Sequence, residues 1–184
     1  VSQHELREKL GYVPQKAVLF SGDIASNILY GNPDGSEAEM TEAATIAQAT
    51  EFIEQKKKKY KSTISQGGSN VSGGQKQRLS IARAIAKHPD VYIFDDSFSA
   101  LDYKTDVTLR AKLKEKTSES TVMIVAQRIS TILHADQIIV LDDGQIVGKG
   151  THKELLKNCE AYYQIASSQL SEKELEEDLK EVES

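Results

Sequence analysis

A pair of glycines directly before a helical pattern offers anion-binding chemistry. Gly73 and Gly74 follow Ser72 and lead into a segment, 75–87, that is predicted to be helical. Glycine has no side chain, so the backbone N–H groups there can approach a ligand closely. The unpaired N–H groups and the macrodipole at a helix start favour an anion. The segment therefore predicts a phosphate-binding element, although a Ser-Gly-Gly alone fits equally well a hinge that only caps its helix.

Two carboxylates stand at the end of an apolar run that follows this helix. The run is 91–94, and Asp95 and Asp96 come directly after it. Such a run suits a parallel strand buried on both faces. In α/β folds, Mg²⁺-nucleotide chemistry takes place at the carboxyl ends of these strands. Asp95 is therefore a candidate Mg²⁺ ligand. An isolated Asp could simply cap a turn, and it is the combination with the glycine pair that favours nucleotide chemistry.

The elements that must position these residues alternate between strand and helix patterns. Strands are predicted at 10–13, 91–94 and 122–125, with a hairpin at 138–149. Helices are predicted at 36–50, 51–58, 75–87, 103–119 and 151–158. This alternation indicates an α/β fold with a parallel core. The acidic segment 171–184 is expected to be a frayed helix or disordered.

Composition narrows the functions that are available. The chain has 184 residues, of which 39% are hydrophobic, so one folded domain is expected. Its net charge of -5 argues against a nucleic-acid partner bound through a general basic surface. No run approaches the ~18 apolar residues of a membrane span. His152 lacks neighbours at metal-ligand spacing, which predicts a surface or capping role.

Four ordered motifs resemble those of the ABC ATPase family. They are the signature 71–78 (VSGGQKQR), the Walker B strand 91–96 (VYIFDD), the D-loop 99–102 (SALD) and the Q-loop 13–15 (VPQ). The segment 19–28 (LFSGDIASNI) is similar to the exporter segment after the Q-loop. The resemblance extends over about 6–169. The interval between the Q-loop and the signature excludes the long coiled-coil insertion of the chromosome-structure ATPases.

The resemblance implies a RecA-like P-loop NTPase core with an inserted α-helical ABC subdomain. The expected core comprises 1–15 and 89–162, the helical signature subdomain 16–88, and a C-terminal tail 163–184. In the family the phosphate-gripping Walker A loop lies upstream of the Q-loop, and no G-x-x-x-x-G-K-[ST] occurs in these residues. We therefore expect an N-terminally truncated fragment whose core is incomplete and which binds ATP poorly in isolation.

The same resemblance assigns roles to residues. Gln15 is expected to touch Mg²⁺ or the attacking water and to relay to the transmembrane domain, and Asp95 to hold Mg²⁺. The family dimer is head-to-tail, so each ATP is covered by the opposite chain. The residues expected to contact nucleotide across or near that interface are Gln15, Ser72, Gly73, Gly74, Gln75, Ser99 and Asp102.

Two catalytic positions depart from the family pattern. Asp96 stands where the family usually has the Glu that polarises the attacking water, and its carboxylate falls short by ~1.5 Å. Gln127 stands where the family usually has the switch His, and an amide cannot carry a positive charge or shuttle a proton. Together these departures resemble the degenerate half of a heterodimeric multidrug-type exporter. A homodimer of slow sites is the alternative. A further departure, Gln66 in place of a common Glu, bears on coupling to the membrane domain.

The expected function is that of an ABC-type transport ATPase at the cytoplasmic face of the cell membrane. The intact protein would hydrolyse MgATP and drive a fused transmembrane domain, with a second nucleotide-binding domain from a different polypeptide as partner. The rivals are a soluble non-transport ABC protein acting on ribosomes or DNA, and an inactive fragment that contributes only the signature surface. The exporter-like segment and the acidic balance favour the exporter.

Overall fold

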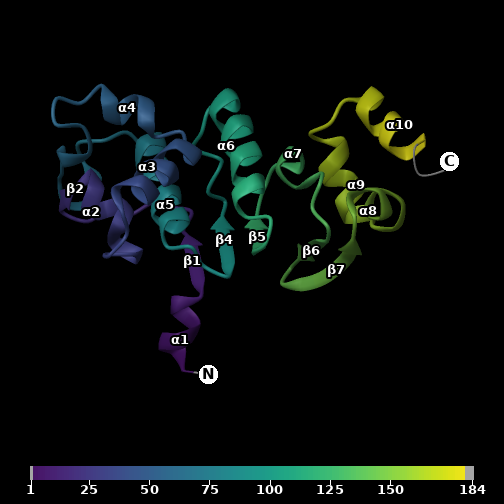
Figure 1. Ribbon diagram of the computed structural model, residues 1–184. Helices are drawn as coiled ribbons and strands as arrows, with labels where there is room; N and C mark the ends of the chain where they lie inside the picture. Colours follow the sequence, from purple (N-terminus) through teal and green to yellow (C-terminus); the bar gives the residue numbers. More distant parts are fainter. Residues whose placement is uncertain (1, 181–184) are drawn as a thin grey trace. The chain divides into compact units, whose positions relative to one another are not determined.

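The computed structural model describes residues 2–180, and the chain divides into two compact units, Val1–Val125 and Ala126–Ser184. The first unit contains a parallel sheet in the order β1 (Leu10–Val13), β4 (Val91–Asp95) and β5 (Thr121–Val125) (Figure 1). The predicted α/β fold with a parallel sheet is thereby confirmed. The boundaries expected for the core, the helical subdomain and the tail stay a prediction.

The two faces of this sheet differ in burial. Val13, Tyr92 and Phe94 point to one face and are almost completely buried. That face shares one hydrophobic core with α5 (Gly73–Ala86) and α6 (Tyr103–Lys116). The other face carries Tyr12 and Met123, and both are more than half exposed. Because side chains alternate along a strand, Asp95 belongs to this second, open face.

The first unit also contains short elements that the sequence analysis did not predict. They are α1 (Gln3–Glu8), α2 (Ile24–Ile28), β2 (Gly22–Asp23), β3 (Thr63–Ile64) and 3-10 turns at Leu29–Gly31, Lys59–Lys61 and Gln66–Gly68. The side chain of Asn27 is buried in α2, where its amide bonds the backbone N and O of Phe20. These side-chain bonds satisfy backbone groups that would otherwise pair within a longer helix or strand. The segment therefore lacks the hydrophobic periodicity from which a longer element could be predicted.

Two predicted helices end early. The helix expected at 36–50 is α3 (Glu37–Ile46), because Gln48 takes a left-handed conformation with φ 56° and stops it. The helix expected at 51–58 is α4 (Thr50–Glu54). The lysines beyond it form a 3-10 turn in which Lys59 has φ 45°. Positive φ at these non-glycine residues is not signalled by residue type.

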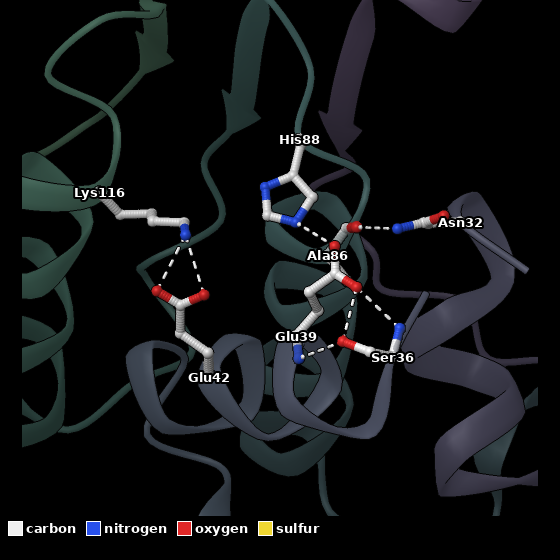
Figure 2. A network of polar contacts seen from close by, with 7 residues as sticks. All are labelled: Asn32, Ser36, Glu39, Glu42, Ala86, His88 and Lys116. Atoms are coloured by element: carbon white, nitrogen blue, oxygen red, sulfur yellow. Dashed lines mark hydrogen bonds and ion pairs between the residues drawn. The ribbon is translucent and has the colours of Figure 1, made fainter. Parts of the chain in front are cut away.

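Polar contacts join α3 to neighbouring parts of the first unit (Figure 2). The imidazole of His88, just before β4, lies 3.3 Å from the carboxylate of Glu39. One turn further along α3, Glu42 accepts hydrogen bonds from the ammonium of Lys116 on α6, both 2.9 Å long. Glu39 also caps α3 by accepting from the backbone N of Ser36. The helical part and the sheet are therefore tied together at the end of the sheet from which β4 begins.

The second unit is a hairpin packed with short helices. It contains α7 (Ile129–Ile132), β6 (Ile138–Asp142), β7 (Gln145–Gly150), α8 (His152–Asn158), α9 (Glu160–Ser167) and α10 (Glu172–Lys180). The predicted hairpin is confirmed, with Asp143 and Gly144 at positive φ in its turn. The expected surface or capping role of His152 is wrong: its side chain is buried between the hydroxyl of Tyr162, at 2.7 Å, and Asp178.

The acidic segment forms a helix as far as Lys180, and residues 181–184 lie outside the described residues. Within residues 2–180, none of the helices has both the length and the apolar character that crossing a membrane requires.

Candidate nucleotide site

Two of the predicted site residues contact each other where β1 and β4 end. The parallel pairing sets Val13 beside Phe94, so the residues that follow both strands lie at the same edge of the sheet. There the side-chain amide of Gln15 donates a hydrogen bond of 3.2 Å to the carboxylate of Asp96. The fully buried hydroxyl of Ser97 donates to the carbonyl of Val13 at 2.9 Å and ties the two strand ends together. The structure thus brings Gln15, Asp95 and Asp96 to one sheet edge.

Asp96 begins the turn that leads away from β4. Its φ is 43°, a left-handed conformation that Asp adopts more readily than most residues. Its backbone N donates to the carbonyl of Val125 at 2.9 Å, which extends the pairing with β5 by one bond. Its own carbonyl accepts from the hydroxyl of Ser99 at 2.9 Å. These two bonds fix the position of the Asp96 backbone. How far its carboxylate extends therefore depends on the length of its side chain.

A tyrosine that the sequence analysis did not single out belongs to this edge. The hydroxyl of Tyr12 donates to Oδ2 of Asp95 at 3.1 Å. The hydrogen bond to Asp95 raises the pKa of Tyr12, so the phenol stays protonated and remains a donor. Tyr12 pairs with Ile93, which lies on the same face as Asp95. Only the strand register reveals this neighbourhood, because the two residues are far apart in the sequence.

The glycine pair opens α5 as expected, although the helix begins at Gly73 rather than at Gln75. Ser72 is the N-cap, and it exchanges two hydrogen bonds of 3.2 Å with Gln75. A methyl group added at Gly73 would meet nothing within 4 Å, and one added at Gly74 would lie 3.3 Å from the carbonyl of Ala100. Gly74 is therefore explained by packing within the chain. At Gly73 the open space leaves its exposed amide accessible from outside.

The start of α5 also carries no negative charge. Four other described helices use a Glu in the matching capping position: Glu5, Glu39, Glu154 and Glu174. Hydrogen bonds from the capping Ser or Thr lower the pKa of each of these carboxyls. In α5 the position is held by the neutral amide of Gln75, and the first turn contains no acidic residue. The macrodipole at this helix start is therefore not offset by a side chain, which favours an external anion.

The D-loop segment lies beside the glycine pair, as the close approach of Ala100 to Gly74 shows. Asp102 is the N-cap of α6, where it accepts from the backbone N of Thr105 at 3.0 Å. Hydrogen bonds from Thr105 are the main cause that lowers the pKa of Asp102. Asp102 thus stabilises the start of α6 within its own chain. Its expected place at a dimer interface stays a prediction.

Gln127 belongs to the second unit, so the structure does not relate it to Asp95 or Asp96. Its backbone carbonyl accepts a 2.8 Å hydrogen bond from the side chain of Gln169. The expected position of Gln127 near a phosphate remains a prediction. Gln66 opens the 3-10 turn that precedes the signature segment.

Comparison with known proteins assigns the chain to a family. A family profile described as "ABC transporter" matches residues 1–99, which is more than half of the chain. The chain belongs to the ABC transporter family. Members of this family bind ATP, and the α/β fold of the chain matches part of the P-loop NTPase fold of the family.

Individual relatives agree with the family. The chain is 47% identical, over 87% of its length, to an uncharacterised ABC transporter ATP-binding protein of Mycobacterium bovis. It is 42% identical, over 89% of its length, to a protein of Staphylococcus aureus named as a candidate multidrug export ATP-binding/permease protein. It spans 28% of the length of each of these relatives.

A solved structure agrees as well. The chain superposes with a TM-score of 0.89 and 37% identity on a bacterial Atm1-family ABC exporter with ATP bound. That match covers 94% of this chain and 30% of the exporter chain. The chain is thus part of the ATP-binding domain of an ABC transporter of exporter type.

Proposed function

We propose that this chain supplies part of the site at which an ABC exporter binds and hydrolyses MgATP to move a substrate across the cell membrane. In this proposal the sheet of the first unit belongs to a RecA-like core, and α2 to α5 belong to an inserted helical signature subdomain. The observation that carries the proposal is the edge at which Gln15, Asp95 and Asp96 gather beyond the parallel strands. That edge is where ligands bind in open α/β sheets.

Mg²⁺ fits this edge only together with a nucleotide. Within the described part of the chain, no group of three or more His, Cys, Asp or Glu side chains could hold a metal ion. Mg²⁺ is, however, commonly held by one or two carboxylates together with substrate phosphates and waters. Asp95 provides such a carboxylate, and Gln15 provides an amide oxygen on the neighbouring strand end. When bound, the ion would neutralise charge that develops on the phosphate oxygens.

The residues at the edge suit an in-line attack of water on the γ-phosphorus. The bond from phosphorus to the β,γ-bridging oxygen breaks, ADP leaves, and the proton of the water passes to a carboxylate or to the phosphate. The hydrogen bond from Gln15 fixes one oxygen of the Asp96 carboxylate. Because positioning dominates this reaction, a side chain one methylene short of Glu predicts slow proton transfer. Gln127, which cannot carry the proton, adds to the same deficit.

We infer from these two residues that the Walker side of this chain belongs to a degenerate site. Its intact Ser72-Gly73-Gly74-Gln75 segment would complete the competent site of a partner nucleotide-binding domain from a different polypeptide. The exposure of Gly73 and the space around it support a partner on that side. A transmembrane domain in the remainder of the protein is supported by the word permease in the name of the Staphylococcus aureus relative. The cytoplasmic face of the cell membrane would then be the site of action.

Hydrolysis by the full-length protein with its partner tests both parts of the proposal. Ser72→Ala together with Gly73→Glu should abolish MgATP hydrolysis while leaving the assembly folded. The first change removes the hydroxyl donor, and the second places a carboxylate that repels the phosphate. Asp96→Asn should reduce hydrolysis far less than the equivalent change in the partner. Full activity in the first variant would contradict the role of the α5 start. Equal loss in the two carboxylate variants would mean a homodimer-like pair of working sites instead of a degenerate one.

A further inference from the structure

We propose that Tyr12 is a positioning residue that orients the Asp95 carboxylate for the metal–nucleotide complex. The inference rests on the function proposed above and adds to it a residue outside the four motifs. Its basis is the 3.1 Å hydrogen bond from the Tyr12 hydroxyl to Oδ2 of Asp95. The two side chains come from neighbouring parallel strands, β1 and β4, and share the open face of the sheet.

Within the described part of the chain, Asp95 is the one hydrogen-bond partner of the Tyr12 hydroxyl. The face opposite to Tyr12 holds the core, where Val13 and Phe94 are fully buried. Packing of the ring on this face does not require the hydroxyl, because a phenylalanine ring would pack in the same way. The Tyr12 hydroxyl nevertheless reaches across to the neighbouring strand and ends on a carboxylate. The contact therefore explains the hydroxyl better than packing does.

For Asp95, this contact is the means by which its side chain is held. Among the described residues, Tyr12 is the one side chain that donates a hydrogen bond to Asp95. When one carboxylate oxygen accepts a hydrogen bond, rotation of the carboxylate is restricted. The second oxygen is then held in an orientation from which it can bind a metal ion. Without the hydroxyl, the carboxylate would turn more freely and would have to be ordered when the metal–nucleotide complex binds. The expected effect is thus on affinity for that complex.

Both carboxylates of the edge are held from the same segment. Tyr12 on β1 donates to Asp95, and Gln15, just beyond β1, donates to Asp96. Each donor serves a different carboxylate, so Tyr12→Phe should affect the metal-dependent step without disturbing the pair formed by Gln15 and Asp96. This separation makes the role of Tyr12 measurable by itself.

The test uses the full-length protein with its partner, and the probe is MnCl₂ with the non-hydrolysable ATP analogue AMP-PNP. Electron paramagnetic resonance reports bound Mn²⁺, and a fluorescent analogue reports nucleotide binding without metal. Tyr12→Phe should weaken Mn²⁺ binding about 3- to 10-fold, since hydrogen bonds to charged groups are among the stronger ones. Binding of the metal-free nucleotide should change less than about 2-fold. Tyr103→Phe, another exposed tyrosine, is the matched control.

The outcomes separate Tyr12 from the site itself. Asp95→Asn should lose metal-dependent binding; if the wild type and Asp95→Asn behave alike, the proposed function fails. If Asp95→Asn loses binding but Tyr12→Phe matches the wild type, the positioning role is overturned and the function stands. Equal weakening with and without metal would also overturn it, because that pattern means general disruption. Replacing Tyr12 by 3-fluorotyrosine, which keeps the ring and the donor, should restore the affinity at neutral pH.

Discussion

Gln75→Glu would place a negative charge at the start of α5 with almost no change of shape. Gln75 and Ser72 exchange hydrogen bonds through their backbone N–H groups and side-chain oxygens, and a Glu preserves both bonds. The fold accepts this arrangement, as the pair formed by Thr151 and Glu154 shows. Near a helix start a carboxylate also gains about 0.3–1 kcal/mol from the macrodipole. The stability of the domain should therefore hold or rise slightly.

Phosphate binding should respond in the opposite direction. The Gln75 oxygen lies 3.2 Å from the Ser72 nitrogen. A phosphate oxygen that accepts a hydrogen bond at the same helix start would lie roughly 3 Å beyond the backbone nitrogens. The introduced carboxylate and the phosphate would then be roughly 6 Å apart. With an effective dielectric constant of about 20–40, their repulsion is about 1.4–3 kcal/mol. This energy corresponds to a loss of about 10- to 100-fold in affinity.

Nucleotide-driven association of the two ATP-binding domains provides the assay. A pair of fluorophores on this chain and its partner, in a hydrolysis-deficient background, gives the ATP concentration at half-maximal association. Gln75→Glu should raise that concentration by about 10- to 100-fold, whereas Gln55→Glu, the same charge change at the end of α4, should leave it unchanged. A shift below about 2-fold in a well-folded Gln75→Glu protein would refute the view that the α5 start faces a phosphate.

Three further predictions follow from the same contacts. Asp96→Glu should raise MgATP hydrolysis by the degenerate site, by up to about a hundredfold if reach alone limits it; phosphate release with the partner site disabled measures this, and no gain would show that reach is not the limit. Gly73→Ala should leave urea unfolding within about 0.5 kcal/mol of the wild type while weakening nucleotide-driven association, and Gly74→Ala should lower the unfolding midpoint because its methyl group meets Ala100. Hydrogen bonds to Thr151 lower the pKa of Glu154 from its ordinary 4.5, so its contribution to stability is present above that pH and is lost as the pH falls through the lowered value. The difference in stability between the wild type and Glu154→Gln should therefore close on acidification in urea titrations, and a difference that does not shrink with falling pH would contradict the assignment.

The sequence predicted the elements whose causes are local. Ser72 and Gln75 mark the start of α5 because a capping box needs only two residues that are three positions apart. The strand β1 was predicted with its exact bounds, since Pro14 closes a short apolar run. The early end of α3 was missed because it depends on the left-handed Gln48, whose side chain gives no signal of it. Local chemistry is thus readable, and backbone conformations fixed by the surroundings are not.

The site shows the same division. Asp95 and Asp96 were found because a buried strand precedes them in the sequence. The structure places Gln15 in contact with Asp96, while the roles of these residues stay a prediction. Tyr12 escaped notice because its relation to Asp95 exists only in the register between β1 and β4. A surface or capping role was expected for His152 because it lacks neighbours at metal-ligand spacing. In the structure its imidazole is buried and contacts Tyr162 and Asp178 from two other helices. Contacts between distant segments set these roles, and composition carries no trace of them.

The buried bond from Ser97 to the Val13 carbonyl has a mechanical consequence. This bond links the last residue of β1 to the turn that follows β4, so a displacement of one strand end is expected to be passed to the other. A movement of Gln15 would then displace the carboxylates of Asp95 and Asp96 together. The Ser97 hydroxyl would in this way couple the two strand ends at the sheet edge that holds Gln15, Asp95 and Asp96.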